Sequence, residues 1–264
     1  MTYNKSFFKL LCIKLRQMKI VTAPPYNSID IQRLLDNIHS TGYVEYQGRN
    51  TVKSIKVADK IWNVKIFKIP HLLNKFVYRY FRKSKAQRSF EYAQKLLEMG
   101  FYTPNPIAYA EQRSALFLSD SFYISEHLDC QLTFRNLIHE PQYPDRTRIL
   151  QEFTEFTYKL QESGVYFIDH SPGNTLIIKQ KDSSYQFYLV DLNRMRFGHL
   201  SYQTRIENFT RLALTDDMLE IIALKYAELC HKEYQDVYTD LLNACDNFKV
   251  KRAKLSALKQ KFKR

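Results

Sequence analysis

Cysteine and glycine are scarce in this 264-residue chain, and their scarcity argues against two kinds of site. The six glycines form no GxGxxG phosphate loop, so each of them marks a local need of the backbone. The cysteines show no CxxC spacing and no accompanying histidine cluster, which predicts free thiols in a reducing cytosol rather than a zinc site or a disulfide framework. The four cysteines are Cys12, Cys130, Cys230 and Cys245.

Long apolar runs are also missing. No run approaches the ~20 residues that a helix needs to cross a bilayer. Residues 1–17 are interrupted by Lys9, Lys14 and Arg16 and lack the apolar region and cleavage site of a signal peptide. Met18 opens a segment that reads as a natural start, so we interpret residues 1–17 as an upstream extension or as a basic surface-binding helix.

The formal charge of +13 is unevenly distributed. Residues 249–264 carry eight basic residues and no acid, and residues 48–88 carry twelve basic residues against one aspartate. A basic face attracts phosphate-rich partners, which include nucleotides, nucleic acid and anionic membranes. For residues 249–264 two interpretations stay open, a disordered solubilising end and a membrane contact.

The order of the expected elements indicates an α+β, bilobal, protein-kinase-like fold. Alternating apolar and polar residues predict strands early in the chain, and apolar residues at helical spacing dominate later. The expected elements are a helix at 28–40, strands within 43–68, one long helix over 71–100, strands in ALFLS and SFYISEHL, a helix at 145–163, a hairpin of TLIIKQ and YQFYLVD, and helices from 204 onward.

This order divides the chain into lobes. We expect a β-rich N-lobe with one long helix at residues 18–125 and a mostly α-helical C-lobe at residues 126–248. Residues 1–17 and the basic tail, residues 249–264, lie outside both lobes.

Three polar residues suggest phosphate-transfer chemistry. In FIDHSPGNTL, Asp169 precedes Asn174 by five positions, the spacing of the catalytic loop HRDxxxxN, so one loop can direct both side chains at the same phosphate. Asp191 ends the apolar run YLVD, where kinases carry the DFG aspartate. We predict that Asp169 orients the acceptor hydroxyl as catalytic base, and that Asn174 and Asp191 hold Mg²⁺.

A lysine and a glutamate in the first half complete the pattern. Lys65 ends WNVK, which resembles the VAIK strand of kinases, and Glu91 lies in the following helix. We predict that Lys65 binds the α- and β-phosphates of ATP and that Glu91 holds this lysine. Lys68 is the alternative to Lys65, and Glu98 is the alternative to Glu91.

The remaining nucleotide contacts are less distinctive. YQGRNTVKS contains one glycine, and Gly48, Arg49 and Asn50 are either a phosphate-binding loop or a plain hairpin turn. SEHLD follows an apolar strand as a hinge would. We expect the backbone around Glu126 and Leu128 to bind adenine.

Several segments together resemble the lipopolysaccharide core kinases, the Kdo/heptose kinase group of Gram-negative bacteria. The similar segments are GRNTVK, NVKIF, SFEYAQKLLEMGFYTPNPIAY, DHSPGNTLI and VDLNRMRFG, and they run from about residue 43 to about residue 212. The resemblance implies transfer of the γ-phosphate of ATP, with Mg²⁺, to a Kdo or heptose hydroxyl of a lipid-linked acceptor. It also implies a cytoplasmic protein, with a peripheral place on the inner membrane as an option.

The chain departs from the kinase pattern at two places. Phe167 replaces the histidine of HRD, and the DFG-like triplet is Asp-Leu-Asn. Neither change removes a metal ligand, so we expect an active enzyme rather than a pseudokinase. No proline follows Pro172, so the APE motif of eukaryotic protein kinases is absent.

Other functions remain as alternatives. A small-molecule or protein kinase of the same atypical fold would share the donor site. The pI of 9.4 raises the question of nucleic-acid binding, but no recognisable motif supports it and we expect no nucleic-acid partner. The helix expected at residues 71–83 either packs on the N-lobe or lies on anionic lipid. Asn208 and Arg211 of ENFTRL have no assigned role beyond support of the C-lobe.

Overall fold

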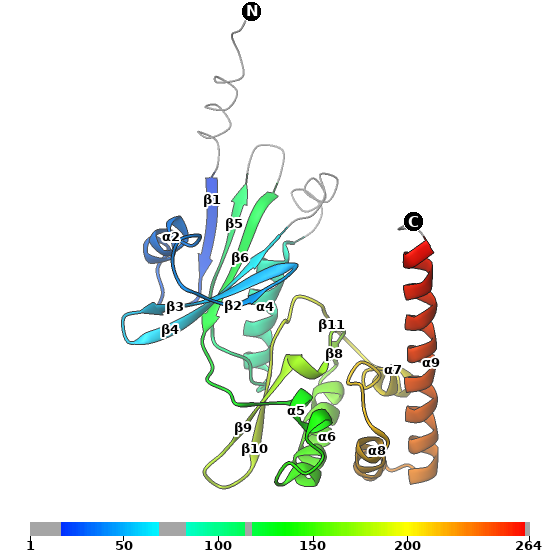
Figure 1. Cartoon of the computed structure of the whole chain (residues 1–264). Coiled ribbons are helices and arrows are strands. Elements are labelled where there is room, and N and C mark those ends of the chain that lie inside the picture. The colour runs from blue at the N-terminus through cyan, green and yellow to red at the C-terminus, as the bar shows by residue number, and fades with distance from the viewer. Residues whose placement is uncertain (1–16, 69–82, 114–117, 262–264) are drawn as a thin grey trace, which may run out of the picture. The chain divides into compact units, whose positions relative to one another are not determined.

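The computed structural model describes residues 17–68, 83–113 and 118–261 (Figure 1). The chain divides into two compact units. The first comprises the residues up to Glu98 together with Thr103–Asp129, and the second comprises Met99–Tyr102 together with the residues from Cys130 onward. The predicted lobe boundary, between residues 125 and 126, lies four residues before this division.

The first unit contains a six-stranded antiparallel sheet in the order β1-β5-β6-β4-β3-β2. Strand β6 lies between β5 and β4, and the earliest strand, β1, pairs with β5 at one edge. The strands are β1 Gln17–Thr22, β2 Tyr43–Gln47, β3 Asn50–Val57, β4 Lys60–Phe67, β5 Pro106–Arg113 and β6 Leu118–Glu126.

Two helices of this unit pack on opposite faces of the sheet. Helix α2, Ser28–Asp36, buries Ile31 and Leu35 against a cluster that includes Trp62 and Val64 of β4. Helix α4, Lys85–Glu98, packs on Phe67 of the same strand. Because side chains alternate along a strand, Phe67 points away from Trp62 and Val64. Strand β4 therefore contributes side chains to the packing of α2 on one face and of α4 on the other.

The sequence prediction for this unit was right in part. Strands were expected within residues 43–68, and β2, β3 and β4 confirm them. One continuous helix over 71–100 is wrong, because Lys83 and Ser84 are not helical and Ser84 Oγ accepts a hydrogen bond from the Gln87 amide at 3.0 Å, as a helix-capping residue does. The part expected over 71–82 lies outside the described residues.

Three further strands were predicted incorrectly or not at all. ALFLS and SFYISEHL were expected to be two strands, but residues 118–126 form the single strand β6; residues 114–117 are outside the described ranges. The strands β1 and β5 were not predicted. They pair with each other at one edge of the sheet. Their residue patterns do not indicate strands, so these strands depend on pairing with a partner distant in sequence.

The second unit is mostly helical. Helices α6, α8 and α9 surround a core in which Phe134, Phe153 and Tyr226 are fully buried (Figure 1). Short strands form a three-stranded sheet, β10-β9-β7, and a two-stranded sheet, β11-β8. The elements are β7 Leu132–Thr133, α5 Phe134–His139, α6 Arg146–Glu162, β8 Val165–Phe167, η1 Pro172–Asn174, β9 Thr175–Lys179, β10 Tyr185–Leu189, β11 Met195–Phe197, α7 Tyr202–Glu207, α8 Asp216–Cys230 and α9 Tyr234–Lys261.

Here the predicted helix at 145–163, the hairpin and the late helices are confirmed. Gly164 ends α6, as expected, with a φ of +74°. A Cβ atom at this position would lie 2.7 Å from the carbonyl oxygen of Gly198, so the glycine allows the chain after α6 to meet the chain after β11.

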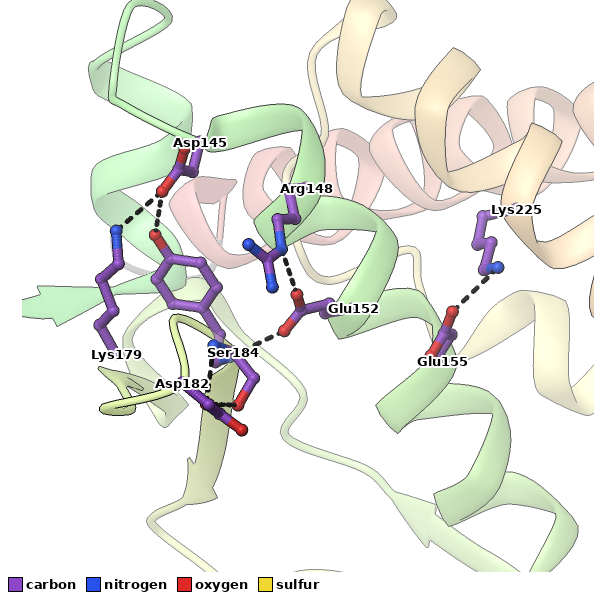
Figure 2. Close-up of polar contacts among 9 residues, drawn as sticks. Asp145, Arg148, Glu152, Glu155, Lys179, Asp182, Ser184 and Lys225 are labelled. Carbon is purple, nitrogen blue, oxygen red and sulfur yellow. Dashed lines mark hydrogen bonds and ion pairs between the residues drawn. The ribbon is translucent and has the colours of Figure 1, made fainter.

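A polar network joins α6 to the β9–β10 hairpin (Figure 2). Asp145 Oδ2 accepts hydrogen bonds from Lys179 Nζ and from the Tyr185 hydroxyl, both at 2.9 Å. Glu152 accepts from the Tyr185 amide at 2.7 Å and from Arg148 Nε at 2.7 Å. The network fixes both strands of the hairpin to one helix.

Helix α9 corrects the expectation for the basic tail. It runs without interruption from Tyr234 to Lys261 alongside α7 and α8, so the tail is helical rather than disordered up to residue 261 (Figure 1). Residues 249–260 are all exposed. Among the described helices, none is long and apolar enough to span a bilayer. Cys130, Cys230 and Cys245 are free thiols, and Cys12 lies outside the described residues.

Candidate active site

The predicted catalytic residues of the second unit lie in two loops that are held side by side. The first loop, residues 168–174, joins β8 to β9, and the second, residues 190–194, joins β10 to β11. The strands that enter and leave these loops pair with each other, β8 with β11 and β9 with β10. Both loops are therefore fixed at both ends.

A backbone hydrogen bond joins the two loops that carry the predicted metal ligands. The Val190 amide donates a hydrogen bond to the carbonyl oxygen of Asn174 at 3.0 Å, which places Asn174 beside the residue that precedes Asp191. The side-chain amide of Asn174 donates to the backbone oxygen of Asp169 at 2.8 Å. These two hydrogen bonds link Asn174 to Asp169 within the first loop and to the residue before Asp191 in the second.

Asp191 has an unusual backbone. Its φ is +60°, in the left-handed region that non-glycine residues seldom adopt. Asn193 Nδ2 donates to Asp191 Oδ1 at 2.5 Å, so the third residue of the Asp-Leu-Asn triplet orients the first. A strained backbone of this kind is common at functional sites, where neighbouring structure maintains it.

These oxygen donors suit magnesium. Mg²⁺ prefers hard oxygen ligands and is commonly held by one or two protein groups together with substrate phosphates. The Asn174 side-chain nitrogen donates to its own loop, so its side-chain oxygen is the atom that would bind the metal. Asp191 would supply a carboxylate. The described residues contain no cluster of three His, Cys, Asp or Glu side chains, and an amide–carboxylate pair would not form one.

Asp169 is held by arginine. Arg194 donates to both carboxylate oxygens, from Nε to Oδ2 and from Nη2 to Oδ1, each at 2.5 Å. Arg211 Nη1 lies 3.8 Å from Oδ1. The Asp169 side chain is 13% exposed, so its carboxylate is accessible although its direction is fixed. Each carboxylate oxygen can accept a second hydrogen bond, which leaves capacity for an acceptor hydroxyl.

The sequence reasoning missed Arg194 and gave Arg211 no role. Arg194 follows the predicted triplet directly, so its place in VDLNR is the signal that could have found it. Asn208 also has a place: its Nδ2 donates to the carbonyl oxygen of Phe167 at 2.8 Å, at the start of the first loop.

His170 supports the same loop from inside. It is fully buried, and its ring centroid lies 5.5 Å from those of Phe153 and Phe167. Burial, the larger effect, lowers the pKa of His170 to about 4, while Asn208 acts in the opposite direction. The ring is therefore neutral at neutral pH. Phe167, which replaces the histidine of HRD, is itself fully buried beneath the loop.

In the first unit, Lys65 lies on the sheet face that α4 covers. It shares this face with Phe67, and Lys65 Nζ is 5.5 Å from the Phe67 ring centroid. Lys68 follows the end of β4 and is exposed. Lys65 and Lys68 thus differ in environment, and the role of Lys65 in nucleotide binding stays a prediction.

Glu91 of α4 has two other contacts. Lys83 Nζ donates to Oε2 at 2.8 Å, and Gln87 Nε2 donates to Oε1 at 2.9 Å. The Lys65–Glu91 ion pair stays a prediction.

The other residues predicted to bind phosphate lie at the β2–β3 turn. Gly48 and Arg49 form the turn between β2 and β3, and Asn50 begins β3, with the Gly48 amide donating to the Asn50 carbonyl at 3.0 Å. The hairpin turn is thus established, and its contact with phosphate stays a prediction.

Glu126 ties the predicted hinge to the sheet. Its carboxylate accepts from Lys60 at 2.7 Å, Asn105 at 2.8 Å and Tyr26 at 3.0 Å. The hydrogen bond from Lys60 is the main cause that lowers the pKa of the Glu126 carboxyl. The Glu126 amide donates to Asn105, so adenine contacts through this segment, including Leu128, stay predictions.

Comparison with known proteins agrees with the loop geometry. The lipopolysaccharide kinase (Kdo/WaaP) family matches residues 39–234, well over half of the chain. The chain belongs to the lipopolysaccharide kinase (Kdo/WaaP) family. The match covers β2 to the start of α9 and includes every predicted site residue.

Solved structures show the fold of this family member. The structure of WaaP in complex with acyl carrier protein has a TM-score of 0.60 at 16% identity, covering 90% of this chain and 99% of that chain. WbdD bound to the kinase inhibitor LY294002 has a TM-score of 0.42 at 14% identity, covering 76% and 44%. No curated protein matches the chain significantly in sequence.

Membership of the Kdo/WaaP family confirms the α+β kinase-like fold and the enzyme class. The protein is a lipopolysaccharide kinase, a phosphotransferase that acts on a sugar hydroxyl. This assignment favours the enzyme over the nucleic-acid-binding alternative.

Proposed function

We propose that this kinase transfers the γ-phosphate of ATP to a hydroxyl of Kdo or heptose in the lipopolysaccharide inner core. The observation that carries the proposal is the Val190–Asn174 hydrogen bond, which brings the loops of Asp169 and Asp191 together in a chain of the Kdo/WaaP family. The acceptor would be lipid-linked, as the family description suggests.

Asp169 is the proposed catalytic base. Its carboxylate accepts the proton of the acceptor hydroxyl while that oxygen forms a bond to the γ-phosphorus, and the bond from the γ-phosphorus to the bridging oxygen breaks to release ADP. Arg194 keeps the carboxylate pointed in one direction. Positioning of this kind supplies much of the catalysis in phosphoryl transfer.

Asn174 and Asp191 are the proposed magnesium ligands. When bound, the metal neutralises charge on the phosphates. Lys65 would bind the α- and β-phosphates, and Glu91 would position Lys65. The β2–β3 turn at Gly48, Arg49 and Asn50 would contact phosphate through backbone and side-chain donors, and the backbone at Glu126 and Leu128 would bind adenine.

The exposed end of α9 supports a peripheral membrane contact. Leu255 and Leu258 are 52% and 51% exposed, and they share one face of the helix. Lys254 and Lys259 flank this face. Apolar residues flanked by lysine are the pattern of helices that lie at an anionic membrane surface, where each basic residue contributes about 1 kcal/mol.

Mass spectrometry of lipid A–core tests the proposed reaction. A host that lacks its own core kinase would express the natural protein, Asp169→Asn, or Asp182→Asn as a matched control in the exposed β9–β10 turn. We expect one added phosphate with the natural protein and the control, and none with Asp169→Asn.

Two other results would contradict the proposal. Added phosphate with Asp169→Asn would remove Asp169 from the mechanism. No added phosphate with any form, although the purified protein binds ATP–Mg²⁺, would exclude the core of that host as acceptor.

A further inference from the structure

A cavity of about 290 Å³ opens beside Asp169 within the second unit. Ile168, the residue before Asp169, lines it, and so does Arg211, whose guanidinium lies 3.8 Å from the Asp169 carboxylate. A hydroxyl placed at this side of the cavity would therefore be next to the proposed base. The volume is just below the range of drug-sized ligand sites, about 300–1,000 Å³, and suits one sugar unit.

The lining of the cavity is polar and contains more cations than anions. Arg211 and Lys251 carry positive charge, and Glu207 carries negative charge. Hydroxyl and amide side chains supply hydrogen-bond donors and acceptors of the kind that bind sugar hydroxyls. These neutral polar residues are Gln203, Asn208, Thr210 and Asn247.

Two more arginines lie on the aromatic residues of the wall. Arg196 stacks on Tyr166 at 4.7 Å, and Arg252 lies 5.8 Å from the Phe248 ring centroid. Arg211 lies over the same Phe248 ring at 5.5 Å. A site surrounded by cations concentrates anionic ligands.

We infer that this cavity is the acceptor site, and that Lys251 and Arg211 bind a carboxylate or phosphate carried by the acceptor sugar. The inference rests on the proposed kinase function and narrows its acceptor to an anionic sugar. Arg211 borders both the cavity and Asp169, so it would position the accepting sugar relative to the base. Lys251, which has no part in the loops of Asp169 and Asp191, would recognise the negative charge.

Helix α9 provides independent support for a lipid-linked acceptor. Ala244, Phe248 and Lys251 line the cavity from one face of this helix. Leu255 and Leu258 continue that face at helical spacing, four and seven residues after Lys251. The lining of the cavity thus leads into the exposed apolar surface of the same helix, as a sugar attached to a membrane lipid requires.

The test uses a soluble probe, the deacylated Kdo-containing inner-core oligosaccharide with its phosphates. Purified natural protein, Lys251→Gln and Lys159→Gln would be compared by rate of transfer from ATP and by calorimetric binding of the probe without ATP. Lys159 is an exposed lysine of α6 away from the cavity, so its variant is the matched control. We expect Lys251→Gln to raise both the KM and the Kd for the probe about tenfold, because one charge-assisted hydrogen bond is lost. The kcat and the KM for ATP should stay unchanged.

Modified probes identify the anionic group. If the carboxylate is recognised, the carboxyl-reduced probe should bind the natural protein as weakly as the intact probe binds Lys251→Gln. If a phosphate is recognised, the dephosphorylated probe should show this loss instead. Unchanged binding of the intact probe by Lys251→Gln, or unchanged binding of both modified probes by the natural protein, would overturn the recognition of negative charge in this cavity.

A bulky substitution tests the location separately. Asn247→Trp would fill the cavity from the exposed surface of α9, and it should abolish binding of the probe while the rise in Tm caused by ATP–Mg²⁺ is retained. Unchanged binding by Asn247→Trp would overturn the cavity as acceptor site. Failure of the natural protein to transfer phosphate to a probe that it binds through Lys251 would instead contradict the proposed function.

Discussion

Arg194 donates a hydrogen bond to each carboxylate oxygen of Asp169, through Nε and Nη2 at 2.5 Å. The two planar groups lie fork to fork, a geometry that lysine cannot reproduce. Because Arg194 belongs to the loop of Asp191, this ion pair fixes the proposed base relative to the proposed magnesium ligand. The relationship spans 25 residues of sequence.

The bidentate contact predicts a specific catalytic defect. Arg194→Lys keeps the charge but loses one hydrogen bond, so Asp169 should lose its fixed direction. We expect kcat to fall about 10–100-fold, the equivalent of one or two charge-assisted hydrogen bonds, with the Kd for ATP unchanged. Rate of phosphate transfer and nucleotide binding measure the two effects. Arg148→Lys, which replaces an exposed arginine of α6, is the control, and an Arg194→Lys enzyme of natural kcat would remove Arg194 from the site.

Removal of the carboxylate at Asp191 should abolish stabilisation by magnesium nucleotide. A ligand present at 100 times its Kd stabilises the folded state by about 2.7 kcal/mol. The natural protein should therefore show a higher Tm with ATP–Mg²⁺ than with ATP and a chelator, and Asp191→Asn should show the same Tm in both. Differential scanning fluorimetry makes this comparison. A magnesium-dependent rise retained by Asp191→Asn would argue against this residue as a ligand.

The ion pair of Arg146 and Asp217 predicts a loss of stability. Arg146 is buried and donates to Leu137 through Nε at 2.8 Å and to Asp217 at 2.5 Å. Asp217→Asn leaves this buried charge without its carboxylate. Since the Asp217 side chain is 56% exposed, water screens part of the effect, and we expect a loss of about 1–2 kcal/mol in the free energy of unfolding.

The pH dependence of this pair has a definite sign. The hydrogen bond from Arg146 is the largest cause that lowers the pKa of Asp217, followed by that from Thr215. The contribution is therefore fully present above the ordinary pKa of aspartate and is lost as the pH falls through the lowered value. Urea unfolding of the natural protein and Asp217→Asn should give a difference that shrinks in acid. A difference that stays constant would contradict the assignment.

His170 predicts a second acid effect in a higher pH range. Its pKa is about 4 in the folded protein, because burial disfavours the charged ring, against about 6.5 when unfolded. The unfolded chain binds a proton first, so stability is full above about pH 6.5 and falls toward pH 4 by roughly 2–3 kcal/mol. His170→Phe should lack this decline. Equal slopes of unfolding free energy between pH 6.5 and 4.5 for both proteins would contradict it.

The local pattern was sufficient to predict much of the second unit. Gly164 marked the end of α6, and the alternation in TLIIKQ and YQFYLVD marked a hairpin that the structure confirms. The spacing of Asp169 and Asn174 predicted that both belong to one loop. These features depend on residues near one another in sequence, which is why the sequence alone could reveal them.

Long-range contacts were harder to predict. The Arg194–Asp169 ion pair depends on the pairing of β8 with β11, and no local signal states which strands pair. The start of α4 shows the same limitation, since Ser84 caps this helix at a point where apolar periodicity predicted a continuous helix. Strand β1 forms where it pairs with β5, a partner about ninety residues later.

Helix α9 has a geometric consequence for the choice of sugar. Seven residues separate Lys251 from Leu258, a rise of about 10 Å along the helix. If Leu255 and Leu258 rest on the bilayer as proposed, this rigid span would set the height of the accepting hydroxyl above the lipid headgroups. The enzyme would then favour a sugar close to the lipid anchor over the outer sugars of the chain.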